Sequence, residues 1–157
     1  RFETLLAVLG EERDVPALAN GYFKNLALGC DRIEFAEELL SYLKDKGYRI
    51  YITTNGFAYT QKNRIENCGL KKYFDKVFIS EDIGEQKPDK AYFDYCINNI
   101  EETDRSKILL VGDSQSSDIL GGINAGIDTC WFNPRGVEAK YAPKYEIKHL
   151  RELTEIL

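Results

Sequence analysis

Segments with β-strand character alternate with helix-like segments from residue 35 to the end of the chain. The strand-like runs occupy residues 48–54, 76–80, 107–113, 128–133 and 145–148. Apolar residues recur at helical spacing in residues 35–47, 60–69, 88–100, 116–126 and 149–157. Strands that are connected through helices pair in parallel. This order therefore predicts a three-layer α/β fold, with a parallel sheet between helices and right-handed crossovers.

Two helices are expected before this alternating part. Residues 2–10 and a segment from Pro16 toward Leu28 carry apolar residues at helical spacing, and Gly10 ends the first of them. A boundary is therefore expected near residues 29–33. The chain of 157 residues is long enough for one domain with a hydrophobic core.

The bulk composition argues against several classes of protein. A net charge of −5 and a pI near 5.0 argue against binding to a nucleic-acid polymer, which needs a basic surface. No apolar run approaches the roughly 20 residues of a membrane span. The four cysteines form no C-x-x-C pair. This spacing argues against a metal knuckle and indicates reduced thiols in a cytoplasmic protein.

Polar residues that suit phosphate chemistry stand where three of the predicted strands end. The sequence TTNG (53–56) ends the first strand, Lys87 lies in the loop after the second, and Asp113 and Asp118 follow the third. The carboxyl ends of parallel strands share one edge, where open α/β sheets bind their ligands. A hydroxyl, backbone amides, an ammonium and two carboxylates together suit a phosphate group and Mg²⁺.

Each of these residues also has a purely structural interpretation. Thr54 can belong to a turn at the strand end, and Lys87 can be a solvated loop charge. Asp118 in the first turn of a helix is favoured by the helix dipole, and Asp113 with Ser114 can cap the same helix. Three strand ends in one chain order, each with a residue type that phosphoryl transfer needs, favour a common site.

The motif series TTNG (53–56), QKPD (86–89) and VGDSQSSD (111–118) resembles the haloacid dehalogenase-like hydrolase superfamily. The longer text around the second and third motifs looks like the branch of noncanonical pyrimidine 5′-nucleotidases. The resemblance implies a Rossmann-like core and a Mg²⁺-dependent phosphomonoester hydrolase that works through an aspartyl-phosphate. It also implies a small phosphorylated substrate, with nucleoside 5′-monophosphates as one candidate class.

The resemblance assigns a role to each motif residue. The residues that contact the phosphate are Thr54, Asn55, Gly56 and Lys87. The threonine hydrogen-bonds the transferring group, the next two residues contribute backbone amides, and the lysine also pairs with the nucleophile. Asp113 is then the direct Mg²⁺ ligand, and Asp118 is the second acid, which holds the ion or its waters.

The first motif of this family, D-x-D-x-T after a leading strand, is absent from the sequence. None of the eleven aspartates is followed two positions later by another, and the one histidine, His149, is no substitute base. The nucleophile and the general acid/base are therefore expected outside this sequence, and the chain alone is expected to be an inactive fragment. The alternative is a natural noncatalytic module that binds phosphate or Mg²⁺ for regulation.

The absent motif also affects the expected domains. By analogy with the family, residues 1–28 are the closing part of a helical cap and residues 29–157 are the α/β core. The missing first strand belongs at the centre of the sheet, between residues 49–54 and 107–112. The run ILLV (108–111) is then expected to be buried on both faces. We expect the empty slot to be filled by the missing N-terminal segment, by another chain, or by direct pairing of the two edges.

Overall fold

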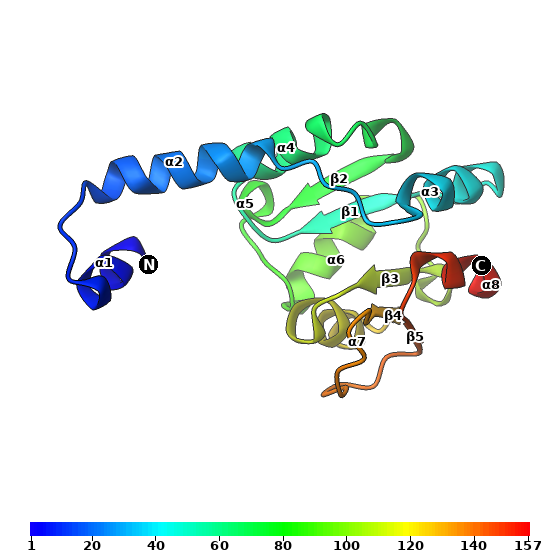
Figure 1. Cartoon of the computed structure of the whole chain (residues 1–157). Helices are drawn as coiled ribbons and strands as arrows, with labels where there is room; N and C mark the ends of the chain where they lie inside the picture. Colours follow the sequence, from blue (N-terminus) through cyan, green and yellow to red (C-terminus); the bar gives the residue numbers. More distant parts are fainter.

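The computed structural model describes residues 1–157 and contains five parallel strands in two separate sheets (Figure 1). In the first sheet, β1 (Tyr51–Thr54) pairs with β2 (Lys76–Ile79). In the second sheet, the strands pair in the order β3 (Leu109–Gly112), β4 (Asp128–Phe132) and β5 (Tyr145–Ile147). The predicted α/β fold with parallel strands is confirmed.

Helices surround both sheets. The longer ones are α1 (Phe2–Leu9), α2 (Val15–Leu28), α3 (Ala36–Asp45), α4 (Ala58–Asn67), α6 (Lys90–Asn98) and α7 (Leu120–Ala125). The short ones are α5 (Ser80–Ile83), α8 (Leu153–Ile156), a π-helical turn at Gln115–Ile119, and 3₁₀ turns at Lys71–Tyr73, Arg105–Lys107 and Leu150–Glu152. α3 packs with α8, and α6 packs with α7. None of these helices has the length and apolar character needed to cross a bilayer.

Most elements lie within a few residues of their predicted bounds, with three differences. The predicted helix at 116–126 is divided into the π-helical turn and α7, and the predicted helix at 149–157 is divided into a 3₁₀ turn and α8. α5 was not predicted, because a single turn that ends at Gly84 is too short to show helical periodicity.

Two apolar clusters hold the layers together. The first lies against α6 and α7 and consists of Phe78, Tyr92, Phe93, Cys96, Ile97, Leu110, Ala125 and Ile127. The second lies against α3 and α8 and consists of Leu39, Cys130, Ile147 and Leu153. The first cluster takes Phe78 from β2 and Leu110 from β3. The layer of α6 and α7 therefore joins the two sheets, although no strand connects them.

The inner edges of the two sheets, β1 and β3, each have a pairing partner on one side only. They flank the position predicted for a missing central strand. Of the three expected ways to fill this slot, direct pairing of the two edges does not occur in the structure, because no ladder joins them. The expectation that ILLV (108–111) is buried on both faces is also wrong at Val111, which is 39% exposed. Its exposure follows from the absence of a neighbouring strand on that side of β3.

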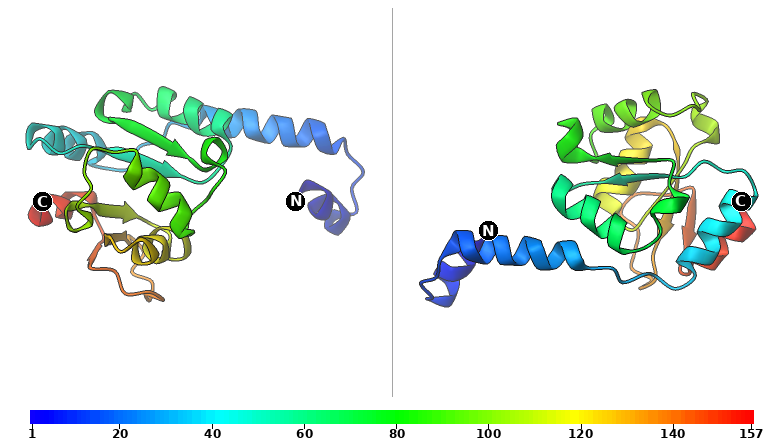
Figure 2. Two further views of the ribbon diagram at one scale, coloured as in Figure 1. Left: turned by 180° about the vertical axis from the view of Figure 1, so that it is seen from behind. Right: turned by 90° about the horizontal axis from the view of Figure 1, so that it is seen from above.

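Helices α1 and α2 extend away from the two sheets (Figure 2). The end of α2 is fixed to the rest of the chain, because Asn67 Nδ2 donates a hydrogen bond to the Ala27 carbonyl oxygen (3.1 Å). The rings of Phe23 and Phe57 also meet edge to face, with centroids 4.9 Å apart. α1 has no buried residue, and Val8 on it is 80% exposed. These two helices therefore present apolar side chains that nothing in the chain covers.

The open edges of β1 and β3 lead us to expect that the isolated chain associates. Unpaired N–H and C=O groups beside an exposed apolar residue can pair with another chain. We expect larger species as the concentration of the 157-residue chain rises, and we expect Val111→Lys to reduce this association. Size-exclusion chromatography with light scattering provides the measurement. Val137→Lys, at another exposed valine, is the matched control. A monomer at every concentration would contradict this expectation.

Candidate active site

Lys87 lies between the two sheets, near the ends of β1 and β3. Its Nζ donates hydrogen bonds to the carbonyl oxygen of Thr53 (2.9 Å) and to Oδ1 of Asp118 (2.7 Å). The two charged side chains are nearly buried, with exposed fractions of 10% and 7%. Removal of either partner would leave a buried charge without compensation, which is costly. The structure thus brings together Lys87 and Asp118, which the sequence analysis assigned to one site.

Asp118 is held in one orientation by its own loop. Its second oxygen, Oδ2, accepts a hydrogen bond from the backbone N–H of Ser114 (3.0 Å). A Cβ atom at Gly112 would lie 2.4 Å from the Asp118 carboxyl carbon, so glycine is required for this close approach. The helix cap comes from the Ser114 hydroxyl, which accepts a hydrogen bond from Ser117 N–H (3.2 Å), and not from Asp113.

Asp113 stands at the exposed side of the site. Its carboxylate forms no ion pair, while its backbone carbonyl accepts a hydrogen bond from Nε1 of the buried Trp131 (3.0 Å). No group of three or more His, Cys, Asp or Glu side chains in the chain can hold a metal ion by itself. Mg²⁺ commonly uses one or two carboxylates together with waters and a substrate phosphate. Asp113 and Asp118 carry the oxygen donors that such a site uses, and their role as Mg²⁺ ligands stays a prediction.

Tyr92 fixes the end of β1 from the layer of α6. Its hydroxyl accepts a hydrogen bond from Thr54 N–H (3.1 Å) and donates one to the Phe78 carbonyl oxygen (2.8 Å). Burial raises the pKa of Tyr92 far above its ordinary value, so the phenol stays neutral and keeps its donor. The Thr54 hydroxyl makes only a 3.4 Å contact with the Asn55 carbonyl and is available to a ligand. Sequence reasoning missed Tyr92, because its helical spacing indicates only a core residue.

Asn55 and Gly56 make contacts that the sequence analysis did not foresee. The Asn55 side chain bonds to the backbone of Lys87, with Oδ1 accepting from its N–H and Nδ2 donating to its carbonyl oxygen, both at 2.9 Å. The N–H of Gly56 donates to Ser80 Oγ (3.0 Å), a residue that the sequence analysis did not select. The role of Asn55 and Gly56 as phosphate-binding amides stays a prediction.

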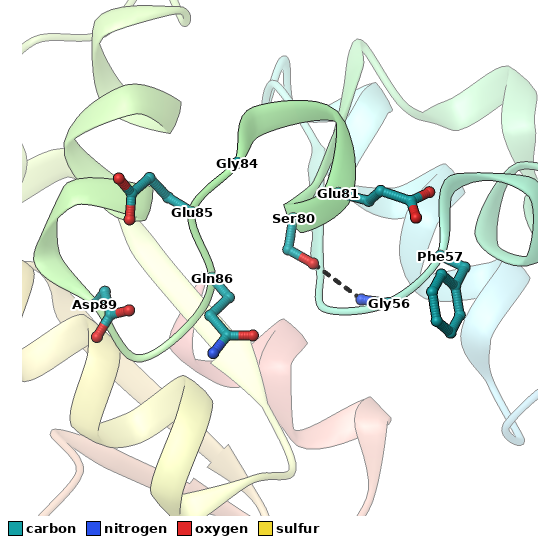
Figure 3. A pocket seen from close by; sticks show the side chains of 8 residues that line it. All are labelled: Gly56, Phe57, Ser80, Glu81, Gly84, Glu85, Gln86 and Asp89. Carbon is teal, nitrogen blue, oxygen red and sulfur yellow. Dashed lines mark hydrogen bonds between the residues drawn. The ribbon is translucent and has the colours of Figure 1, made fainter.

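A cleft of about 490 Å³ opens beside these residues (Figure 3). The lining residues come from the loop after β1, from α5 and from the segment between α5 and α6, and they are Gly56, Phe57, Ser80, Glu81, Gly84, Glu85, Gln86 and Asp89. Glu81 is partly engaged, because its Oε2 accepts a hydrogen bond from Ala58 N–H (2.7 Å). Phe57 is 53% exposed. Of the predicted site residues only Gly56 lines this cleft, which an aromatic ring and carboxylates border.

Parallel strands with polar residues at their carboxyl ends are the arrangement in which open α/β sheets bind ligands. The profile described as "Haloacid dehalogenase-like hydrolase" matches residues 4–132. The chain belongs to this hydrolase family, and the resemblance seen in the three sequence motifs is confirmed.

Similar proteins match the chain along its whole length. The HAD-hydrolase YfnB of Bacillus subtilis (strain 168) is 41% identical over 100% of this chain and 67% of its own length. Two pyrimidine 5′-nucleotidases, YjjG of Escherichia coli (strain K12) and PynA of Streptococcus pneumoniae (strain ATCC BAA-255 / R6), are 41% and 38% identical over 100% of this chain, and over 69% and 67% of their own lengths. The crystal structure of YfnB bound to magnesium has a TM-score of 0.92 and 42% identity, over 99% of this chain and 68% of that one. The chain thus spans about two thirds of the length of these relatives.

Gly112→Ala is expected to displace the Asp118 carboxylate and weaken its contact with Lys87, because the added Cβ would collide with the carboxyl group. We expect the free energy of unfolding to fall by about 1–3 kcal/mol, measured by urea denaturation. Gly21→Ala is the matched control, since no atom lies within 4 Å of the added Cβ in α2. The free energy of unfolding of the control is expected to rise by up to about 1 kcal/mol. Unchanged stability of Gly112→Ala would show that the loop can move away.

Proposed function

We propose that the protein is a Mg²⁺-dependent phosphomonoester hydrolase. The observation that carries this proposal is the Lys87 ammonium, which is held at the strand ends by the Thr53 carbonyl and the Asp118 carboxylate. A cation that is already fixed in place stabilises phosphate oxygens without rearrangement during the reaction. Membership of the hydrolase family, and the pyrimidine 5′-nucleotidases among the relatives, support the proposal.

The phosphate binds at the carboxyl ends of β1 and β3. A lysine ammonium has three N–H donors. Two of those of Lys87 are used within the protein, so the third is available to a phosphate oxygen. The Thr54 hydroxyl is a second donor, and the neighbouring amides of Asn55 and Gly56 complete the predicted phosphate site. The Gly56 amide must first exchange its contact with Ser80 for one with the phosphate.

Asp113 would hold Mg²⁺ directly, because its carboxylate is exposed and has no ion-pair partner. Asp118 would hold the ion or its waters as the second acid, while its two oxygens also accept hydrogen bonds from Lys87 and from Ser114. When bound, Mg²⁺ supplies positive charge that offsets the charge of the phosphoryl oxygens. The magnesium-bound crystal structure of YfnB supports this choice of metal.

The attacking carboxylate lies outside these 157 residues, in a strand that fills the slot between β1 and β3. The absence of a D-x-D pair in the sequence and the greater length of the relatives support this proposal. In the reaction, a carboxylate oxygen forms a bond to phosphorus as the ester P–O bond breaks, and the leaving alkoxide takes a proton from a general acid. Water then hydrolyses the aspartyl-phosphate.

Residues 1–28 form the closing part of a cap domain, and residues 29–157 form the catalytic core. The uncovered apolar side chains of α1 and α2 support this division, because they need a further partner to be buried. The leaving group lies toward the cleft that Phe57 borders. An aromatic ring at this place suits a nucleoside, which makes nucleoside 5′-monophosphates the first candidate substrates.

The test is phosphate release by the natural full-length protein from an aryl phosphate and from a panel of nucleoside monophosphates. We expect turnover with Mg²⁺ and none with EDTA. The 157-residue chain, free of longer forms, is expected to release no phosphate even with excess Mg²⁺, because it contains no attacking carboxylate. If the full-length protein binds phosphate and Mg²⁺ but turns over none of these esters, the noncatalytic regulatory module is the better description.

Asp113→Asn in the full-length protein is expected to weaken Mg²⁺ binding and to lower kcat by about 100-fold or more, because a direct ligand loses its charge. Its stability should stay within about 0.5 kcal/mol, since the helix cap is Ser114. Kinetics against Mg²⁺ concentration and thermal unfolding measure both effects. Asp45→Asn, at an exposed aspartate that forms no ion pair at the end of α3, is the matched control. Normal activity with reduced stability would assign Asp113 a structural role instead.

A further inference from the structure

We propose that the Asn55 side chain is a positioning group for Lys87 and makes no direct contact with the phosphate. This inference rests on the proposed function, because it concerns the lysine that binds the phosphate there. Asn55 follows Thr54 directly in the chain, at the end of β1, while Lys87 lies 32 positions later in the loop before α6. The two phosphate-binding residues are therefore joined through one asparagine side chain.

The contact between Asn55 and Lys87 is a pair of hydrogen bonds with a single geometry. Asn55 Oδ1 accepts from the Lys87 N–H and Asn55 Nδ2 donates to the Lys87 carbonyl oxygen, each at 2.9 Å. One amide group thus satisfies both backbone polar groups of one residue. A rotation of either partner would break at least one bond. The pair therefore fixes the backbone of Lys87 relative to the end of β1.

Asn55 is itself held in place from two sides. Its carbonyl oxygen accepts a hydrogen bond from Gln61 Nε2 in α4 (3.0 Å), and the following Gly56 is tied to Ser80 at the start of α5 (3.0 Å). Hydrogen bonds to α4 and α5 thus restrain the segment around Asn55, and Lys87 is hydrogen-bonded to the Asn55 side chain. Since a lysine side chain is a flexible stem of four carbons, a fixed backbone helps to direct its Nζ to Thr53 and Asp118.

The position of Asn55 in the site argues for an effect on geometry more than on stability. The residue is exposed, so water replaces much of what its hydrogen bonds contribute to folding. A shift of Lys87, in contrast, moves the ammonium away from the phosphate. Misplacement of a catalytic group by about 1 Å can cost a factor of about 100 in rate. Loss of the Asn55 side chain should therefore lower kcat while the melting temperature changes little.

The deciding experiment is a double-mutant cycle in the natural full-length protein with an aryl phosphate as substrate. We expect Asn55→Ala to lower kcat by about 10- to 100-fold in the presence of Lys87. In the Lys87→Ala background we expect Asn55→Ala to lower kcat by less than about 3-fold, because the lysine that Asn55 positions is gone. An equal loss in both backgrounds would overturn the inference, since Asn55 would then act on the phosphate or on the fold without Lys87. Asn63→Ala is the matched control, because it removes one hydrogen bond, from the side-chain amide to the Tyr59 carbonyl oxygen (2.7 Å), within α4.

A second measurement separates failure of this inference from failure of the proposed function. If the full-length protein hydrolyses no phosphate ester, the proposed function fails, and hydrogen exchange at the Lys87 backbone amide decides the inference. We expect faster exchange at Lys87 in Asn55→Ala and unchanged exchange in Asn63→Ala. Unchanged exchange in both variants would overturn the positioning role of Asn55.

Discussion

The ion pair between Lys87 and Asp118 is the interaction on which the rest of the site depends. It joins two sheets that share no ladder, because the lysine is also bonded to the end of β1 and the aspartate follows β3. The apolar layer of α6 and α7 keeps the two sheets close, but apolar packing has no direction. The nearly buried charged pair is directional, and it fixes the positions of the two strand ends relative to each other.

Groups that do not contact a substrate fix the orientation of each proposed functional side chain. Asp118 is held by the amide of Ser114 and by the space that Gly112 leaves. The loop of Asp113 is attached to the indole of Trp131 through its backbone carbonyl, which leaves the carboxylate exposed. Contacts within the chain therefore fix these side chains of the proposed site, which suits electrostatic stabilisation of a transition state.

The order of strands and helices could be predicted from the sequence, because periodicity and strand-end residues are local signals. The meeting of Lys87 with Asp118 could also be predicted, since the carboxyl ends of parallel strands share an edge. The gap between the two sheets lies where the sequence analysis placed a missing central strand, but the exposure of Val111 was missed, because an apolar run indicates burial whether or not a neighbouring strand exists. Tyr92 and Ser80 were missed for another reason. Their partners are backbone groups on other elements, and such contacts leave no pattern in the residues around them.

The hydroxyl of Tyr92 lies where the ladder of β1 and β2 ends, and its two hydrogen bonds limit which residues can replace Tyr92. A phenylalanine at this position would leave the Thr54 N–H and the Phe78 carbonyl oxygen without their shared partner, and Phe78 is buried while Thr54 is half-buried. Evolutionary change at residue 92 in helix α6 is thus tied to a strand end 38 positions earlier in the chain. The constraint falls on residue 92 itself, because Thr54 and Phe78 contribute backbone groups that nearly every residue supplies.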